Sequence, residues 1–190
     1  RCRHAMESIK RAFRWDEDRF GHEISCLEGA AGMVCLTAEL GRDQDPWPAS
    51  PALQQLSLEE LQPGQPSALL VGMAGQSHWS QCVDAEPATT SLTFDVACRV
   101  QRKPQWLGSC YRAHHDAECR PTPTGRIALG GGVELTIEPA AGSPPARITG
   151  AGGLLVIVPD LRVLGFPSTV RWKYRISLRA ATASPGGAVS

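Results

Sequence analysis

Residues 170–179 read VRWKYRISLR, and this stretch decides the class of fold. Its apolar residues occupy every second position, and the positions between them carry basic or polar side chains. A period of two is the pattern of a β-strand that buries one face. Residues 92–101, LTFDVACRVQ, repeat the pattern, and residues 133–138, VELTIE, give a shorter version of it. The sequence therefore predicts a core built from strands.

Turn-forming residues separate these predicted strands. Clusters rich in glycine and proline occur at residues 121–125, 130–132, 139–145 and 150–153. The apolar run 154–158, LLVIV, is typical of a strand buried on both faces, and Pro159 ends it. Short strands that follow one another without intervening helices indicate an antiparallel sandwich or barrel.

The N-terminal part shows a different pattern, which favours helix. Four apolar side chains recur there at spacings of three, four and seven: Met6, Ile9, Phe13 and Phe20. These spacings place them on one face of a helix over residues 4–20, and Gly21 suits the position that follows its C-terminus. A second helix is predicted over residues 27–40, LEGAAGMVCLTAEL.

The patterns together predict a mainly β protein with an N-terminal α region (α+β), an antiparallel β-sandwich or barrel preceded by one or two helices. We expect an N-terminal helical segment (1–45), a Pro-rich linker with a short helical turn (46–66), a β-sandwich-like domain (67–180) and a disordered tail (181–190). The linker begins with Pro46, Pro48 and Pro51, and its helical turn rests on a capping-box pattern at residues 57–60, SLEE.

The composition limits the classes of partner. The formal net charge is zero, so a protein partner is expected rather than nucleic acid. No run of about 18 apolar residues occurs, so we expect no transmembrane segment. The sequence begins at Arg1 without the apolar core of a signal peptide, which favours the cytoplasm, although a processed N-terminus would leave secretion open.

Seven cysteines are too few for a disulfide scaffold, and their odd number leaves at least one thiol free in a monomer. Cys82 and Cys98 fall on strands that are predicted to pair. A disulfide between them would form only if the strand register brings them within bonding range, and otherwise both are reduced packing residues.

Residues 5–23, AMESIKRAFRWDEDRFGHE, resemble a segment of the aminopeptidase N family of zinc metallopeptidases. The matching or conservatively replaced positions are Ala5, Met6, Ser8, Ile9, Lys10, Phe13, Trp15, Asp16, Glu17, Phe20 and Gly21. In that family the segment is scaffolding without zinc ligands. No His-Glu-x-x-His pair follows here, and His22-Glu23 is followed by Cys26 where a histidine would be needed. The resemblance implies a fragment or an inactive relative of a zinc-dependent aminopeptidase.

One dense cluster of metal-capable side chains has the pattern C-x3-H-H-x3-C and consists of Cys110, His114, His115 and Cys119. Two sulfurs and two imidazoles suit tetrahedral zinc, the one cofactor that the sequence suggests. The spacing is not that of the common zinc fingers, and a polar surface loop is the alternative interpretation.

A basic stripe projects from one face of the stretch at 170–179: Arg171, Lys173, Arg175 and Arg179. Such a stripe is a candidate surface for an anion. A solvated sheet face, or docking onto the acidic N-terminal portion, is the alternative. No Gly-x-Ser-x-Gly elbow or recognisable catalytic triad is found, so no catalytic residue is assigned.

The sequence therefore predicts a non-catalytic, β-rich binding or interaction domain. An inactive aminopeptidase relative and a small zinc-binding module are the alternatives.

Overall fold

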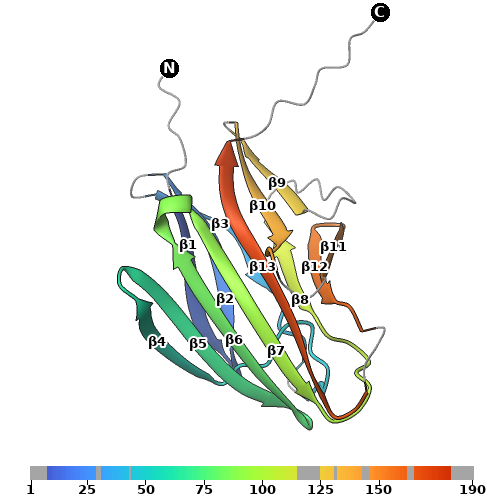
Figure 1. The fold of residues 1–190 in the computed structure, drawn as a ribbon. Coiled ribbons are helices and arrows are strands. Elements are labelled where there is room, and N and C mark those ends of the chain that lie inside the picture. The colour runs from blue at the N-terminus through green and yellow to red at the C-terminus, as the bar shows by residue number, and fades with distance from the viewer. Residues whose placement is uncertain are drawn as a thin grey trace, which may run out of the picture.

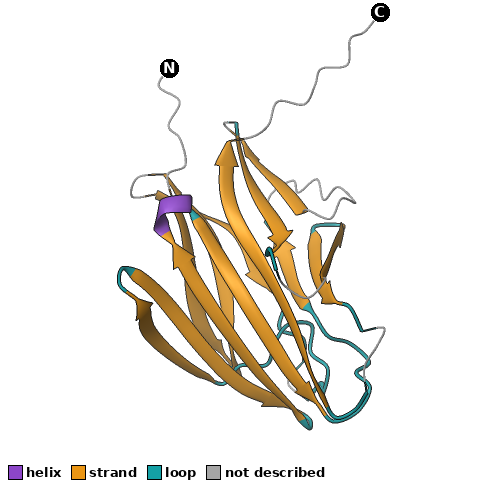
Figure 2. Ribbon diagram, viewed as in Figure 1, coloured by secondary structure: helices purple, strands orange, loops and turns teal. Residues whose placement is uncertain are grey.

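The computed structural model describes residues 8–28, 31–42, 44–114, 125–130, 132–142, 146–161 and 165–180. The chain forms two antiparallel sheets that face one another (Figure 1). Within the described ranges the only helical segment is the 3-10 turn η1, Pro87–Thr89 (Figure 2). No described helix has the length and apolarity needed to cross a bilayer.

Sheet A has six strands in the order β1-β2-β3-β8-β12-β11, and sheet B has seven in the order β4-β5-β6-β7-β13-β10-β9. The strands of sheet A are β1 (Ser8–Asp16), β2 (Arg19–Glu28), β3 (Ala31–Ala38), β8 (Ser109–Ala113), β11 (Ala146–Ala151) and β12 (Leu154–Pro159). The strands of sheet B are β4 (Gln55–Gln62), β5 (Gln65–Ala74), β6 (Ser77–Glu86), β7 (Ser91–Val100), β9 (Gly125–Gly130), β10 (Val133–Pro139) and β13 (Ser168–Ala180).

The core lies between the two sheets, and β7 and β13 supply its centre. These strands pair directly, with Phe94 opposite Tyr174 and Val96 opposite Trp172, and all four side chains are fully buried. The alternation predicted for residues 92–101 and 170–179 is confirmed. Fully burying one such side chain contributes about 1.5–3 kcal/mol, so the register of this pair is strongly fixed.

The predicted N-terminal α region is wrong, because residues 8–28 form the hairpin β1–β2. Ile9 and Phe13 are four residues apart, a spacing that places two side chains on one face of a helix and also of a strand. Pairing decides between the two: Phe13 lies opposite His22, and Glu17 turns the chain with a positive φ of 55°. Gly21 lies within β2 instead of ending a helix.

The second predicted helix, over residues 27–40, is also wrong, since most of it is β3. Its continuous apolar run is explained by a bulge between β2 and β3. Ser25 lies opposite Val34 and Ile24 opposite Leu36, which leaves Cys35 as an extra residue. Both Cys35 and Leu36 are completely buried, so the helical interpretation mistook a bulged strand for a helix.

Residues 46–54 pass from sheet A to sheet B as an ordered crossing. Trp47, Ala52 and Leu53 are buried in the core. Phe20 of β2 donates its backbone N–H to the Leu53 carbonyl at 2.7 Å, and Gln54 donates to the Val71 carbonyl of β5 at 2.9 Å. The helical turn expected at residues 57–60 is instead part of β4. The tail expected at 181–190 lies outside the described residues.

Candidate functional site

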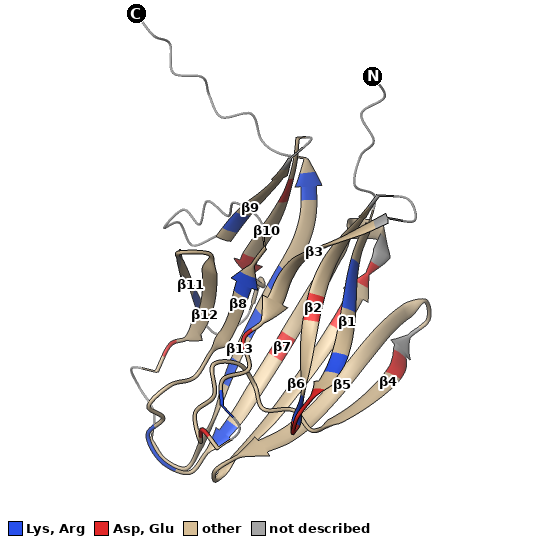
Figure 3. Cartoon of the chain, turned by 180° about the vertical axis from the view of Figure 1, so that it is seen from behind, with Lys and Arg blue, Asp and Glu red and all other residues tan. Residues whose placement is uncertain are grey.

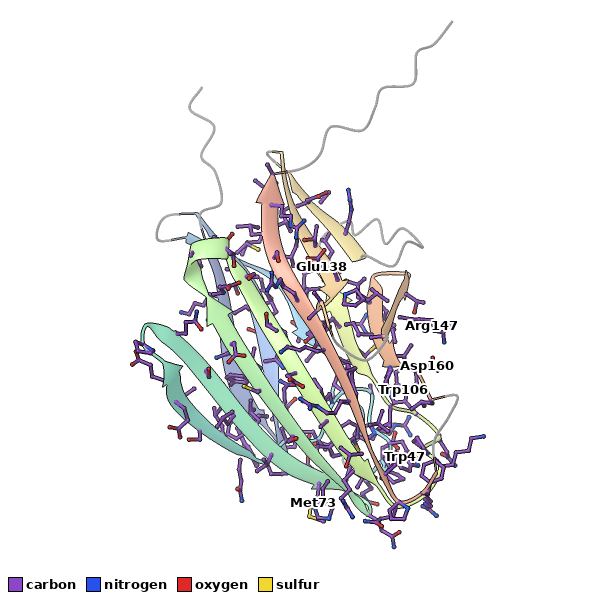
Figure 4. All side chains as sticks on the ribbon, in the orientation of Figure 1. Trp47, Met73, Trp106, Glu138, Arg147 and Asp160 are labelled. Carbon is purple, nitrogen blue, oxygen red and sulfur yellow. The ribbon has the colours of Figure 1, made fainter. Side chains whose placement is uncertain are left out.

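A groove of about 540 Å³ opens on one side of the molecule, on the outer face of sheet A. Its lining comes from the loop between β7 and β8, from β11, and from the end of β12 with the residues that follow: Gln105, Trp106, Leu107, Arg147, Val158, Pro159, Asp160 and Leu161. Figure 4 shows Arg147, Asp160 and Trp106 along this side of the molecule. We call it the Trp106 groove.

The strand pairing explains why Arg147 lines the groove. Arg147 lies opposite Val158 in the β11–β12 ladder, while the neighbouring pair Ile148 and Ile157 is buried in the core. Because side chains alternate along a strand, Arg147 and Val158 point out of sheet A. The groove therefore has a basic side chain from β11 beside an aliphatic one from β12.

Trp106 is held by contacts on two sides. Its Nε1–H donates to the Ala49 carbonyl at 3.3 Å, which links it to the crossing segment. Gly108 brings the loop close to β12, since a Cβ there would lie 2.7 Å from the Ile157 carbonyl oxygen and 3.0 Å from the indole ring. Trp106 also lines a second hollow of about 430 Å³ together with Trp47 and Asp45.

The chemistry of the Trp106 groove is that of a binding surface. The half-buried side chains of Trp106, Val158 and Leu161 supply apolar contact area. Arg147 supplies an exposed cation, whereas Asp160 already has an interaction within the chain. Among the described residues that line the groove there is no cysteine, serine or histidine, so none of them pairs a nucleophile with a base.

A buried chain of polar side chains joins the two sheets and is the second candidate. His22 Nε2 lies 2.9 Å from the Tyr111 hydroxyl, which lies 2.6 Å from the Tyr174 hydroxyl. Burial lowers the pKa of His22 to about 3 and raises the pKa of both tyrosines, so all three groups are neutral at pH 7.

His22 also stacks on Phe94, with ring centroids 5.4 Å apart. The Tyr111 and Tyr174 side chains are completely buried, and His22, which is 6% exposed, is among the residues that line a hollow of about 380 Å³. We therefore interpret this chain as a structural link between the sheets.

The predicted zinc ligands are only partly described. Cys110 is buried in β8, with its backbone bonded to the Ser50 hydroxyl. His114 Nε2 lies 2.7 Å from Thr37 Oγ1. Across the described residues no group of three or more His, Cys, Asp or Glu side chains could hold a metal ion. His115 and Cys119 lie outside the described residues, so the four-ligand site stays a prediction.

The basic stripe on β13 faces carboxylates on neighbouring strands and on the end of β6 (Figure 3). The ion pairs are Arg171–Asp95 at 2.9 Å, Lys173–Asp95 at 3.7 Å, Arg175–Glu86 at 3.7 Å and Arg179–Glu138 at 2.9 Å. Exposed pairs of this kind contribute at most about 1 kcal/mol each, but they balance the local charge. The anion-facing surface stays a prediction, and we base no function on it.

The sequence did not single out the Trp106 groove. Its lining comes from three separate segments that become neighbours only when β11 and β12 are placed beside β8. One signal was present: Trp106 is a large aromatic in the loop sequence RKPQWLGS, and exposed aromatics in loops often mark binding sites.

No protein family model matches this chain, and no curated protein matches its sequence. The resemblance of residues 5–23 to the aminopeptidase N family therefore stays a prediction.

Proposed function

We propose that this protein is a non-catalytic interaction domain that binds a short segment of a partner protein in the Trp106 groove. The observation that carries the proposal is the groove itself, about 540 Å³ in volume, with an apolar lining beside an exposed arginine. This volume is in the range of natural ligand sites, roughly 300–1,000 Å³.

The composition of the groove supports a protein ligand. Protein interfaces combine an apolar centre with a polar rim, and tryptophan and arginine are enriched among the residues that dominate their binding energy. Trp106 and Arg147 provide this pair. The remaining apolar residues are small or aliphatic, which suits one inserted apolar side chain of a peptide.

The positive charge of Arg147 favours ligands that carry a carboxylate. Arg147 has an exposed side chain on β11, so a ligand carboxylate near the inserted apolar side chain gains a charge-assisted hydrogen bond. We therefore expect bound segments to combine an apolar or aromatic residue with an acidic one.

A peptide-display library selected on the intact protein tests the proposal. Selected peptides are then measured on Trp106→Ala and Arg147→Ala. The matched controls are Trp15→Ala, which removes a half-exposed tryptophan from β1, and Arg99→Ala, which removes an exposed arginine from β7. Thermal melts establish that each variant folds.

We expect Trp106→Ala to weaken binding at least about tenfold, Arg147→Ala to weaken it about three- to tenfold, and neither control to change it. Arg147 is exposed, so its variant keeps the test valid if Trp106→Ala is unstable. The proposal is wrong if no peptide is selected. It is equally wrong if binding depends on the exposed pair Val71 and Met73 on β5 instead of the groove.

A further inference from the structure

Two buried thiols meet between β2 and β3. The sulfurs of Cys26 and Cys35 lie 3.1 Å apart, at hydrogen-bonding distance, and the two residues are 1% and 0% exposed. We propose that Cys26 and Cys35 are a redox pair that is converted to an intramolecular disulfide by a low-molecular-weight disulfide such as oxidised glutathione.

The bulge between these strands creates the pair. Cys26 lies opposite Met33, and the extra residue Cys35 is turned towards the core next to Leu36. Both sulfurs therefore lie on the inner face of sheet A. The sulfurs are already 3.1 Å apart, so they need to approach by only about 1 Å to reach the disulfide bond length of roughly 2.05 Å.

The other described cysteines do not form such a pair. Cys82 lies opposite Asp95, whereas Cys98 lies opposite Trp79, so the two are three positions apart along the β6–β7 ladder. Side chains alternate along each strand. In β7 the even-numbered residues, among them Cys98, face the core, whereas in β6 the odd-numbered residues face the core and Cys82 faces outward. The disulfide considered for Cys82 and Cys98 is therefore excluded by the register.

The exchange proceeds in two balanced steps. The Cys35 thiolate attacks one sulfur of oxidised glutathione, forms a mixed disulfide and releases one glutathione thiolate. The Cys26 thiolate then attacks the Cys35 sulfur, forms the Cys26–Cys35 bond and releases the second glutathione thiolate. The protein loses two electrons and two protons, and one oxidised glutathione becomes two reduced molecules.

The order of attack follows from the local hydrogen bond. The bond between the two sulfurs lowers the pKa of Cys35, so Cys35 is the first thiolate, and the same contact raises the pKa of Cys26. Cys26 lies near the C-terminal end of β2. Because both sulfurs are buried, glutathione can reach them only when the adjoining ends of β2 and β3 open locally. The disulfide therefore forms faster during refolding than in the native state.

The test refolds the reduced, full-length chain in glutathione buffers of increasing oxidised fraction, followed by intact mass and peptide mapping. The variants are Cys26→Ala and Cys35→Ala, and the matched control is Cys98→Ala, which removes another buried cysteine from a strand. We expect wild type and Cys98→Ala to lose two hydrogens and to yield a crosslinked peptide containing Cys26 and Cys35. The crosslink should raise Tm by roughly 5–10 °C.

Neither Cys26→Ala nor Cys35→Ala should show that rise. The proposal is overturned if oxidised wild type keeps both thiols, or if the mapped crosslink joins other cysteines. If a variant fails to fold, peptide mapping of the wild-type protein alone decides whether the Cys26–Cys35 crosslink forms. The result does not depend on ligand binding in the Trp106 groove, because the experiment contains no ligand for that groove.

Discussion

Replacing Gly72 with alanine tests whether the crossing segment at residues 52–54 is an integral part of the sandwich. Gly72 lies in β5, and the crossing segment passes directly against it. A Cβ on residue 72 would lie 2.7 Å from the Leu53 Cα, and closer still to the Ala52 carbonyl oxygen and Gln54 Oε1. Backbone atoms lie in the way, so a side-chain rotation cannot relieve the clash.

The expected cost has two parts. Displacing the packed segment resembles overpacking a core, which costs about 1–3 kcal/mol. The displacement also strains the hydrogen bonds through which Gln54 continues the sheet. Met73 N–H donates to Gln54 Oε1 at 2.7 Å, and Gln54 Nε2–H donates to the Met73 carbonyl at 3.1 Å.

Each of these hydrogen bonds contributes about 0.5–1.5 kcal/mol. We expect Gly72→Ala to lower the free energy of unfolding by about 3–5 kcal/mol, and Tm by roughly 10 °C for a chain of this size.

Urea unfolding followed by tryptophan fluorescence measures the change. The matched control is Gly165→Ala, because a Cβ there meets no atom of the described residues within 4 Å and the backbone does not have a positive φ. We expect the control to remain within about 0.5 kcal/mol of wild type. A Gly72→Ala protein as stable as the control would refute the reasoning, since residues 52–54 would then move aside freely, as a linker does.

Two further predictions concern buried polar groups. Burial lowers the pKa of His22 in the folded protein to about 3, whereas in the unfolded chain the His22 pKa is about 6.5. Between these two values the unfolded chain binds more protons than the folded one. The stability that neutral His22 contributes is therefore complete above pH 6.5 and is lost as the pH falls towards 3. Relative to His22→Gln, wild type should therefore lose about 2 kcal/mol between pH 7 and pH 5 in urea titrations, and parallel pH profiles would contradict the assignment. Within the described part of the chain neither amide atom of the buried Gln81 has a hydrogen-bond partner, so Gln81→Met should raise the free energy of unfolding by about 1 kcal/mol or more. If urea titration instead shows that Gln81→Met lowers the free energy of unfolding by about 1 kcal/mol, the Gln81 amide has hydrogen-bond partners in solution.

The sequence by itself determined the strands with strict alternation. Residues 92–101 and 170–179 bury the expected faces, because a period of two cannot be met by a helix without burying charge. It did not determine the N-terminal part. Ile9 and Phe13 share a face in either structure, and β1 became a strand because β2 lies beside it as a pairing partner.

Only the tertiary structure decided which distant residues meet. Trp106 and Arg147 line one groove because β12 pairs with β8, and the sulfurs of Cys26 and Cys35 meet because a bulge shifts the β2–β3 register. Local sequence carries the preference of a segment for strand or helix, but strand order and register depend on the total buried surface of both sheets. For that reason the pairing of the strands, and with it both proposed sites, follows from the folded chain alone.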